Sequence, residues 1–164
     1  MSKFKKNVCV VGASGLLGSN VLKEALARGY KVNGTLRDVS APGKATFLNA
    51  LPNAEANLRL FEAEMADKAS FDDAFSNADC VFIACLIPIY KGPTGKPARE
   101  MDDEQGYEEI IMPTVNGCLN IMNAAAKQRV KNVVICSSTS KTNPIPPVPI
   151  KNEINPVSYT HLRA

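Results

Sequence analysis

The chain has 164 residues, of which 45% are apolar and 21% are charged. These values are close to those of globular domains and exclude a disordered chain or a collagen-like repeat, and the length suits about one domain of roughly 100–200 residues. A net charge of +3, no tryptophan and 6% aromatic residues give no basis for nucleic-acid binding by electrostatics or stacking.

The first part of the chain alternates between strand and helix patterns. Residues 7–11 (NVCVV) form a β-branched run that predicts a buried strand, and residues 15–28 place apolar side chains on one face of a helix. Residues 30–36 predict a second strand. A loop with a short helix near 44–51 follows, and the apolar–polar alternation of residues 57–62 predicts a third strand.

The middle of the chain continues this alternation. Residues 67–77 predict a helix in which Asp67 is the N-cap. Residues 79–87 (DCVFIACLI) are the most apolar run and predict a central strand. Residues 88–104 contain several prolines and glycines and predict a loop.

Residues 105–129 have a helical pattern that contains Pro113. This proline either breaks or kinks the first part of the helix, or is the first residue of the main helix. Residues 131–136 (KNVVIC) predict a fifth strand. Alternating strands and helices predict an α/β fold, a doubly wound parallel sheet with helices on both faces.

Cysteine spacing and hydropathy exclude other kinds of site. The five cysteines are odd in number and contain no Cys-x-x-Cys pair, so we expect neither a metal site nor a redox pair. They are predicted to be buried thiols of a reducing, cytoplasmic protein. No run reaches the roughly 18–20 apolar residues of a membrane span, so no membrane partner is expected.

A glycine motif lies between the first strand and the first helix. In GASGLLG, Gly12 permits the tight turn out of the strand, Gly15 lets the backbone approach a pyrophosphate, and Gly18 lets the helix pack against the sheet. The amide groups from Ser14 to Leu17 would then point at the phosphates, with the helix dipole adding to the attraction. The motif in this context predicts a Rossmann-type dinucleotide-binding site.

The end of the second strand bears on the choice of cofactor. An NAD-preferring site has an Asp or Glu there, whereas this chain has Arg37, whose guanidinium suits a 2′-phosphate. Lys44 would add a second positive charge. Asp38 is a possible displaced ribose ligand, which keeps NAD as the alternative, but the sequence favours NADP(H).

Three passages in order carry a family resemblance: CVVGASGLLGSNVLKEALARGYKVNGTLRD, AEMADKASFDDAFSNADCVFIACLIP and PTVNGCLNIMNAAAKQRVKNVVICSSTS. Across about residues 7–140 the chain resembles the extended short-chain dehydrogenase/reductases. Within them it is most similar to the dihydroflavonol reductase and cinnamoyl-CoA reductase group of NADPH-dependent reductases. The related epimerases and 3β-hydroxysteroid dehydrogenases share this half of the fold.

The resemblance implies roles for individual residues. The pyrophosphate would be held by the glycine turn, which comprises Gly12, Ser14, Gly15, Leu16, Leu17 and Gly18. The 2′-phosphate would be held after the second strand by Arg37 and Lys44. The adenine would lie against Glu64 and Met65 at the end of the third strand, and the nicotinamide ribose against Ala84 and Cys85 at the end of the fourth. Ser138 matches the catalytic serine that polarises a substrate carbonyl, with Ser137 as the alternative; otherwise both hydroxyls cap the strand end.

The proton donor of this family is a Tyr followed four residues later by Lys. After Ser138 the chain has Tyr159, but four residues later it has Arg163 instead of Lys. We therefore expect the Tyr/Lys pair to lie outside this chain and these 164 residues not to turn over substrate. Residues 1–140 are predicted to be an incomplete NADP-binding Rossmann domain. Residues 141–164 are predicted to be an irregular proline-rich tail whose end, PVSYTHLRA, resembles a translated sequencing adapter.

The leading functional hypothesis concerns the parent protein, an NADP(H)-dependent oxidoreductase. It would act on the CH–OH or carbonyl group of a small aldehyde, ketone or dihydroflavonol-type substrate, with this chain as the cofactor-binding half. The alternatives are a non-catalytic NADP-binding regulator on the same fold, and an epimerase or 3β-hydroxysteroid dehydrogenase relative. The sequence leaves the substrate and the oligomeric state open.

Overall fold

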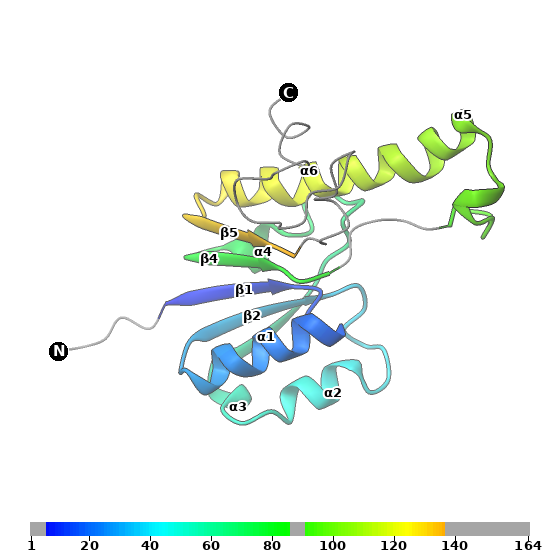
Figure 1. Cartoon of the computed structure of the whole chain (residues 1–164). Helices are drawn as coiled ribbons and strands as arrows, with labels where there is room; N and C mark the ends of the chain where they lie inside the picture. The colour runs from blue at the N-terminus through cyan, green and yellow to red at the C-terminus, as the bar shows by residue number, and fades with distance from the viewer. Residues whose placement is uncertain (1–5, 86–90, 137–164) are drawn as a thin grey trace, which may run out of the picture.

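A computed structural model describes residues 6–85 and 91–136 of the chain. They form a five-stranded sheet of order β3-β2-β1-β4-β5 in which every pairing is parallel (Figure 1). The strands are β1 (Asn7–Val11), β2 (Lys31–Leu36), β3 (Leu58–Glu62), β4 (Cys80–Ile83) and β5 (Asn132–Ile135). The predicted parallel sheet is confirmed, and its order reverses direction between β1 and β4, where ligands bind in doubly wound sheets.

Helices cover both faces of the sheet (Figure 1). One face packs against α1 (Leu16–Ala27), α2 (Lys44–Asn49) and α3 (Ala54–Asn57), and the other against α4 (Asp72–Phe75) and α6 (Met112–Lys127). Helix α3 lies in a segment that was expected to be loop. The two layers give the sheet two separate hydrophobic cores.

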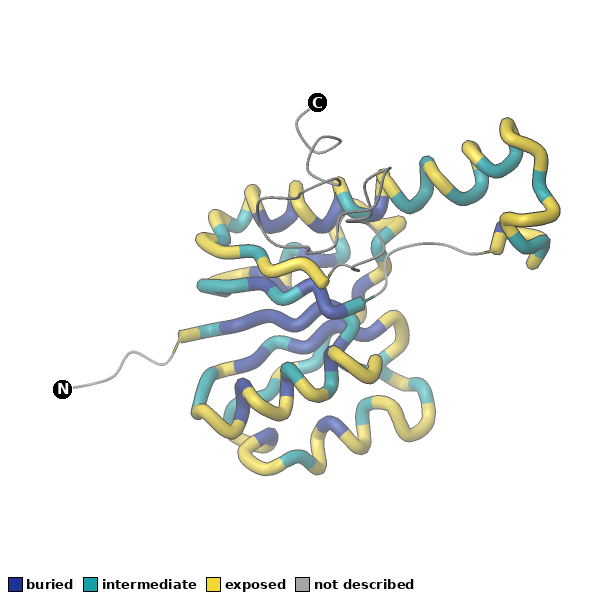
Figure 2. The backbone as a smooth tube through the Cα atoms, in the orientation of Figure 1, coloured by how far each residue is buried: buried dark blue, intermediate teal, exposed yellow. Residues whose placement is uncertain are grey.

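Strand β1 shows why the central strands are continuously apolar. Val8 and Val10 point into the core under α1, whereas Cys9 and Val11 point into the core under α4 and α6. Side chains alternate across a strand, so a strand that is covered on both sides needs apolar residues at every position. Burying each large apolar side chain stabilises the fold by about 1.5–3 kcal/mol. Figure 2 shows this buried centre between helices whose outer faces are exposed.

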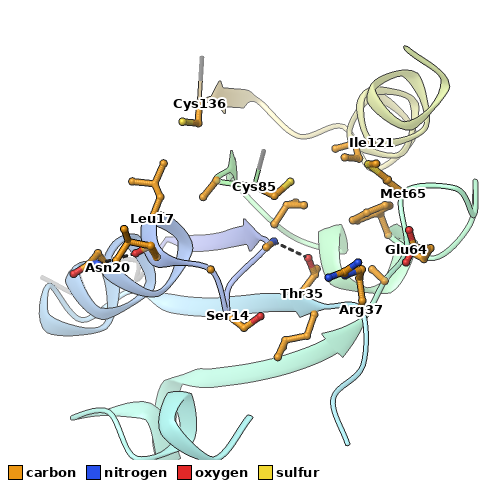
Figure 3. A pocket seen from close by; sticks show the side chains of 18 residues that line it. Ser14, Leu17, Asn20, Thr35, Arg37, Glu64, Met65, Cys85, Ile121 and Cys136 are labelled. Atoms are coloured by element: carbon orange, nitrogen blue, oxygen red, sulfur yellow. Dashed lines mark hydrogen bonds between the residues drawn. The ribbon is translucent and has the colours of Figure 1, made fainter. Parts of the chain in front are cut away.

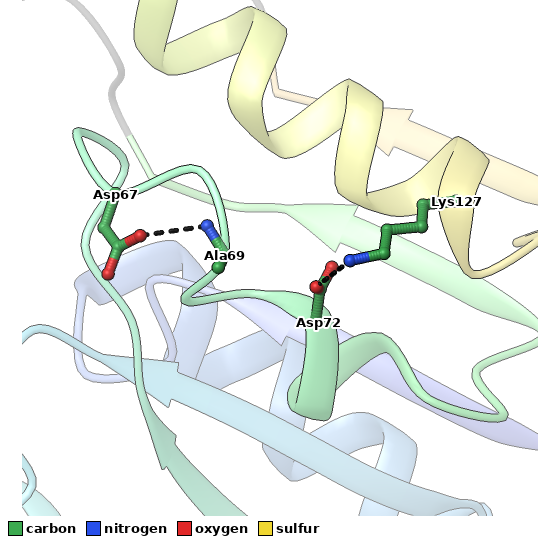
Figure 4. Close-up of polar contacts among 4 residues, drawn as sticks. All are labelled: Asp67, Ala69, Asp72 and Lys127. Carbon is green, nitrogen blue, oxygen red and sulfur yellow. Dashed lines mark hydrogen bonds and ion pairs between the residues drawn. The ribbon is translucent and has the colours of Figure 1, made fainter.

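The helix predicted over residues 67–77 is shorter in the structure. Helix α4 spans only Asp72–Phe75, and its N-cap residue is Phe71. Asp67 therefore does not cap the helix, and that prediction is wrong. Its Oδ1 instead accepts the N–H of Ala69 at 2.9 Å, which closes a local turn before the helix (Figure 4). Helix α4 is joined to α6 by the ion pair between Asp72 and Lys127.

The loop predicted over residues 88–104 contains short ordered elements from residue 91 onward. Lys91 and Pro97 form an isolated antiparallel bridge, and a 3₁₀ turn, η1, spans Ala98–Glu100. The carboxylate of Asp102 accepts the N–H of Gln105 at 2.8 Å and so caps the helix that follows.

Pro113 affects the long helix in a specific way. The helix begins as α5 (Asp103–Gly106), widens into a π-helical segment, η2 (Tyr107–Ile111), and continues as α6 with Pro113 near its start. Proline has no N–H and its ring crowds the carbonyl four residues earlier, which here belongs to Glu109 within η2. Pro113 is the second residue of α6, one position after the helix start, and the turn before it is the widened segment η2.

The cysteines are less uniformly buried than predicted. Cys9 is fully buried, and burial raises the pKa of its thiol. Cys80, Cys85 and Cys118 are partly buried, and Cys136 is exposed. The expectation of burial is wrong for Cys136 because it follows β5, the edge strand of the described sheet, whose residues have a largely exposed pattern.

Candidate cofactor-binding site

A cavity of about 1000 Å³ opens at the carboxyl ends of the strands (Figure 3). Its walls come from the chain after β1, β2, β3, β4 and β5, from the first turn of α1 and from α6. Residues from separate parts of the sequence meet here because the carboxyl ends of parallel strands share one edge of the sheet. Ten of the residues that the sequence predicted line it: Gly12, Ser14, Gly15, Leu16, Leu17, Arg37, Glu64, Met65, Ala84 and Cys85.

The glycine turn forms the floor of the cavity. Gly12 has a φ of +76°, and a Cβ on it would lie 2.6 Å from the Cβ of Cys85, so both the turn and the close approach require glycine. Gly18 does not line the cavity. A Cβ at Gly18 would lie 2.1 Å from the carbonyl oxygen of Gly12, which means that helix α1 packs directly on the turn.

The N-terminus of α1 faces the cavity without a cap of its own. Gly15 is the N-cap residue and contributes no side-chain hydrogen bond, and the first turn has no acidic residue. The first N–H groups of a helix have no intrahelical partner and carry a partial positive charge, so they favour an anion. Leu16 is 88% exposed and Leu17 is 44% exposed beside them. The space over Gly15 and these donors fit a pyrophosphate group.

A second cavity of about 370 Å³ adjoins the first, and Ser14, Arg37 and Glu64 line both. It brings Arg37 and Lys44 to one site, as the sequence predicted for a 2′-phosphate. Asp38 also lines it, but its Oδ1 accepts hydrogen bonds from the N–H and the hydroxyl of Ser40, at 2.8 and 2.7 Å. These bonds hold the pKa of Asp38 below its ordinary value. The carboxylate is thus engaged within its own loop.

Glu64 and Met65 leave the end of β3 on the same side of the cavity as Arg37 (Figure 3). The hydroxyl of Ser70 holds the backbone of Glu64, accepting its N–H at 3.1 Å and donating to its carbonyl at 2.8 Å. Met65 packs on α6, where a Cβ on Gly117 would lie 3.0 Å from its sulfur. The carbonyl of Met65 accepts the side-chain amide of Asn120 at 2.9 Å.

Asn120 joins α6 to the loop after β3 and is 8% exposed. We expect Asn120→Ala to lower the free energy of unfolding by about 1–3 kcal/mol, because this hydrogen bond is partly buried and the carbonyl of Met65 loses its donor. Urea denaturation measures this value. Asn123→Ala is the matched control, since Asn123 is exposed on the same helix and the change in helix propensity is identical. Equal losses in the two variants would contradict a structural role for this hydrogen bond.

Ala84 and Cys85 follow β4 and form the part of the wall nearest the glycine turn. Cys85 is partly buried, and this burial raises the pKa of its thiol. Ser137 and Ser138 lie outside the described residues. Cys136, directly before them in the sequence, lines the cavity, and its N–H donates to the carbonyl of Ile83 at 3.0 Å.

Several lining residues were not singled out by the sequence. Thr35 contacts the glycine turn, and Asn20 donates from its side chain to the carbonyl of Leu16 at 2.7 Å. Residues four apart share one face of a helix, so the spacing of Asn20 from Leu16 could have predicted that Asn20 lies beside the cavity. Phe71 and Ile121 also line the cavity, but their place there depends on how α4 and α6 pack, which no local pattern shows.

Within residues 6–85 and 91–136, no group of three His, Cys, Asp or Glu side chains is arranged to hold a metal ion. In the same part no helix has both the length and the apolar character that crossing a membrane requires.

Comparison with known proteins shows the family of the chain. A family profile described as NAD(P)H-binding matches residues 12–163. Dihydroflavonol 4-reductase of Arabidopsis thaliana is 36% identical over 144 residues, which are 87% of this chain and 35% of that protein. Tetraketide alpha-pyrone reductase 1 of the same plant is 38% identical over 141 residues, covering 85% of this chain and 40% of that protein.

Solved structures give the same picture. Vestitone reductase from alfalfa superposes with a TM-score of 0.63 at 31% identity, covering 85% of this chain and 38% of that chain. Gre2 from Candida albicans in complex with NADPH superposes with a TM-score of 0.62 at 26% identity, covering 84% and 38%. The chain thus spans well under half the length of these relatives. It belongs to the NAD(P)H-binding family, among the extended short-chain dehydrogenase/reductases similar to dihydroflavonol 4-reductase.

Proposed function

We propose that this chain binds NADP(H) in the two adjoining cavities, as the cofactor-binding part of an oxidoreductase. The observation that carries the choice of NADP(H) over NAD is the meeting of Arg37 and Lys44 in the second cavity. A 2′-phosphate there would be paired with two cations, while Asp38, the possible ribose ligand, already has its Oδ1 engaged by Ser40. NADPH in the related Gre2 complex supports the same class of cofactor.

The other predicted residues take roles along the cavity. The N–H groups at the start of α1, around Ser14 to Leu17, would bind the pyrophosphate, with Gly12, Gly15 and Gly18 shaping the turn. Glu64 and Met65 would lie against the adenine, and Ala84 and Cys85 against the nicotinamide ribose. The binding domain would comprise residues 1–140.

The reaction would be reduction of a carbonyl, or oxidation of the matching alcohol, in a small aldehyde, ketone or dihydroflavonol-type substrate. When bound, NADPH would supply the hydride, and a proton donor of the whole enzyme would complete the alcohol; in the oxidation direction NADP+ would accept the hydride. Ser138, or Ser137, would donate a hydrogen bond to the substrate oxygen and so polarise the carbonyl. The names of the relatives, dihydroflavonol 4-reductase and tetraketide alpha-pyrone reductase, support this substrate class.

Titration with NADPH and with NADH, followed by the nicotinamide fluorescence, tests the proposal. We expect NADPH to bind at least about tenfold more tightly than NADH, because each charge-assisted hydrogen bond to the 2′-phosphate contributes about 1.5–3 kcal/mol. This preference should fall as salt is added. Tighter binding of NADH would overturn the choice of NADP(H), and binding of neither nucleotide would overturn the function.

A further inference from the structure

Thr35, near the end of β2, is 2% exposed and is one of two buried polar side chains among the described residues. It makes two contacts with the glycine turn. Its Oγ1 accepts the N–H of Gly12 at 3.3 Å (Figure 3). Its backbone carbonyl accepts the N–H of Ala13 at 2.9 Å. The side chain and the main chain of one residue therefore hold two successive amides of the turn.

The hydroxyl is needed because of the conformation of Gly12. The β1–β2 pairing ends with Val11 opposite Thr35, and the left-handed φ of Gly12 then turns the chain toward α1. The N–H of Gly12 donates to a side chain at the point where the strand pairing ends. A partly buried N–H without an acceptor is costly, so the turn depends on an oxygen at position 35. Valine also favours strands but has no hydroxyl, so strand propensity alone does not explain a threonine at position 35.

The orientation of the Gly12 peptide affects the rest of the motif. The carbonyl of Gly12 accepts the N–H of Gly15 at 3.0 Å, and the same oxygen lies against Gly18 of α1. A rotation at Gly12 would therefore shift the first turn of α1, where the unpaired N–H groups face the cavity. Thr35 thus bears on the anion-binding end of the helix through the Gly12 amide.

We propose that Thr35 is a positioning residue for the dinucleotide: it holds the glycine turn so that the N-terminus of α1 is aimed at the pyrophosphate. This inference rests on the proposed function, because it assumes that a dinucleotide occupies the cavity. It differs from the role of Arg37, which concerns the 2′-phosphate alone. The pyrophosphate is common to NADPH and NADH, so a change at Thr35 affects both nucleotides equally.

The test compares Thr35→Val with Thr35→Ser. Valine keeps the β-branched shape but removes the acceptor, whereas serine keeps the acceptor and removes a methyl group. We expect Thr35→Val to weaken NADPH and NADH binding by the same factor, about tenfold, because the Gly12 amide loses its acceptor. We expect Thr35→Ser to stay within about twofold of the parent chain. Affinities are measured at a temperature where circular dichroism shows each variant folded.

Hydrogen exchange of the Gly12 amide gives a readout that needs no ligand. Exchange should be faster in Thr35→Val than in the parent chain and in Thr35→Ser. Parent-like affinity in folded Thr35→Val, or equal losses in the valine and serine variants, would overturn the role of the hydroxyl. If Thr35→Val does not fold, the serine variant alone decides: a loss of tenfold or more there would also overturn it. Failure of the parent chain to bind either nucleotide would instead refute the proposed function.

Discussion

Gly18→Ala is expected to destabilise the domain and to abolish dinucleotide binding. A Cβ at this position would lie 2.1 Å from the carbonyl oxygen of Gly12 and 2.8 Å from its carbonyl carbon. Both are backbone atoms, so the clash can be relieved only by moving α1 away from the turn. Overpacking costs about 1–3 kcal/mol and occasionally more, and a 2.1 Å approach to a backbone atom argues for the upper end; the gain in helix propensity from Gly to Ala, about 1 kcal/mol, offsets only part of that cost. Thermal unfolding and NADPH titration measure the two effects.

Gly15→Ala is the matched control within the same motif. Gly15 has a φ of −76°, which alanine adopts freely, and its Cβ would lie at an ordinary 3.4 Å from the Gly12 oxygen. We expect a loss of stability of up to about 1 kcal/mol, because alanine is a poorer N-cap than glycine. The added methyl group would stand in the cavity and weaken NADPH binding. Equal loss of stability in the two variants would contradict the packing role of Gly18.

Arg37→Ala is expected to change the choice of cofactor. It should weaken NADPH binding about 10- to 150-fold, the equivalent of one charge-assisted interaction of about 1.5–3 kcal/mol. NADH has no 2′-phosphate, so its affinity should change by less than about twofold. Lys44→Ala should have the same selectivity, since Lys44 lines the same cavity. Competitive titration of the two nucleotides gives the ratio directly.

Arg59→Ala is the control for net charge. Arg59 is exposed on β3 and lines neither cavity, so its removal lowers the net charge equally without touching the site. A similar loss of NADPH affinity in Arg59→Ala would attribute the effect to general electrostatic attraction. Loss of both NADPH and NADH in Arg37→Ala would show that Arg37 supports the turn, and would contradict its assignment to the 2′-phosphate.

The central strands and the glycine motif followed from local patterns. The apolar run of residues 7–11 indicates a strand covered on both faces, and both cores do contain its side chains. The spacing of Gly12, Gly15 and Gly18 predicts a turn, an open approach and a helix contact, and the structure has each of these at the expected glycine. Short-range spacing is informative here because each requirement arises within a few residues of the chain.

Elements with weak local signals were less predictable. Asp67 has the residue type of an N-cap but closes a turn with Ala69 instead, because a short polar side chain serves a turn and a helix start equally well. Pro113 was compatible with a break or kink in the helix or with a helix start at the proline. In the structure the helix widens into a π-helical segment just before it. In both cases the local chemistry permits more than one structure, and packing against neighbouring elements selects between them.

By itself, the sequence determined the α/β class, the position of the dinucleotide motif and the ends of strands that contribute site residues. Only the tertiary structure decided which distant groups meet: Thr35 with Gly12, and Asn120 with Met65. The physical reason is that periodicity reports which face of an element is buried, but not what lies opposite that face. Hydrogen bonds across 23 and 55 residues of sequence depend on how the strands and helices cross, which local patterns do not report.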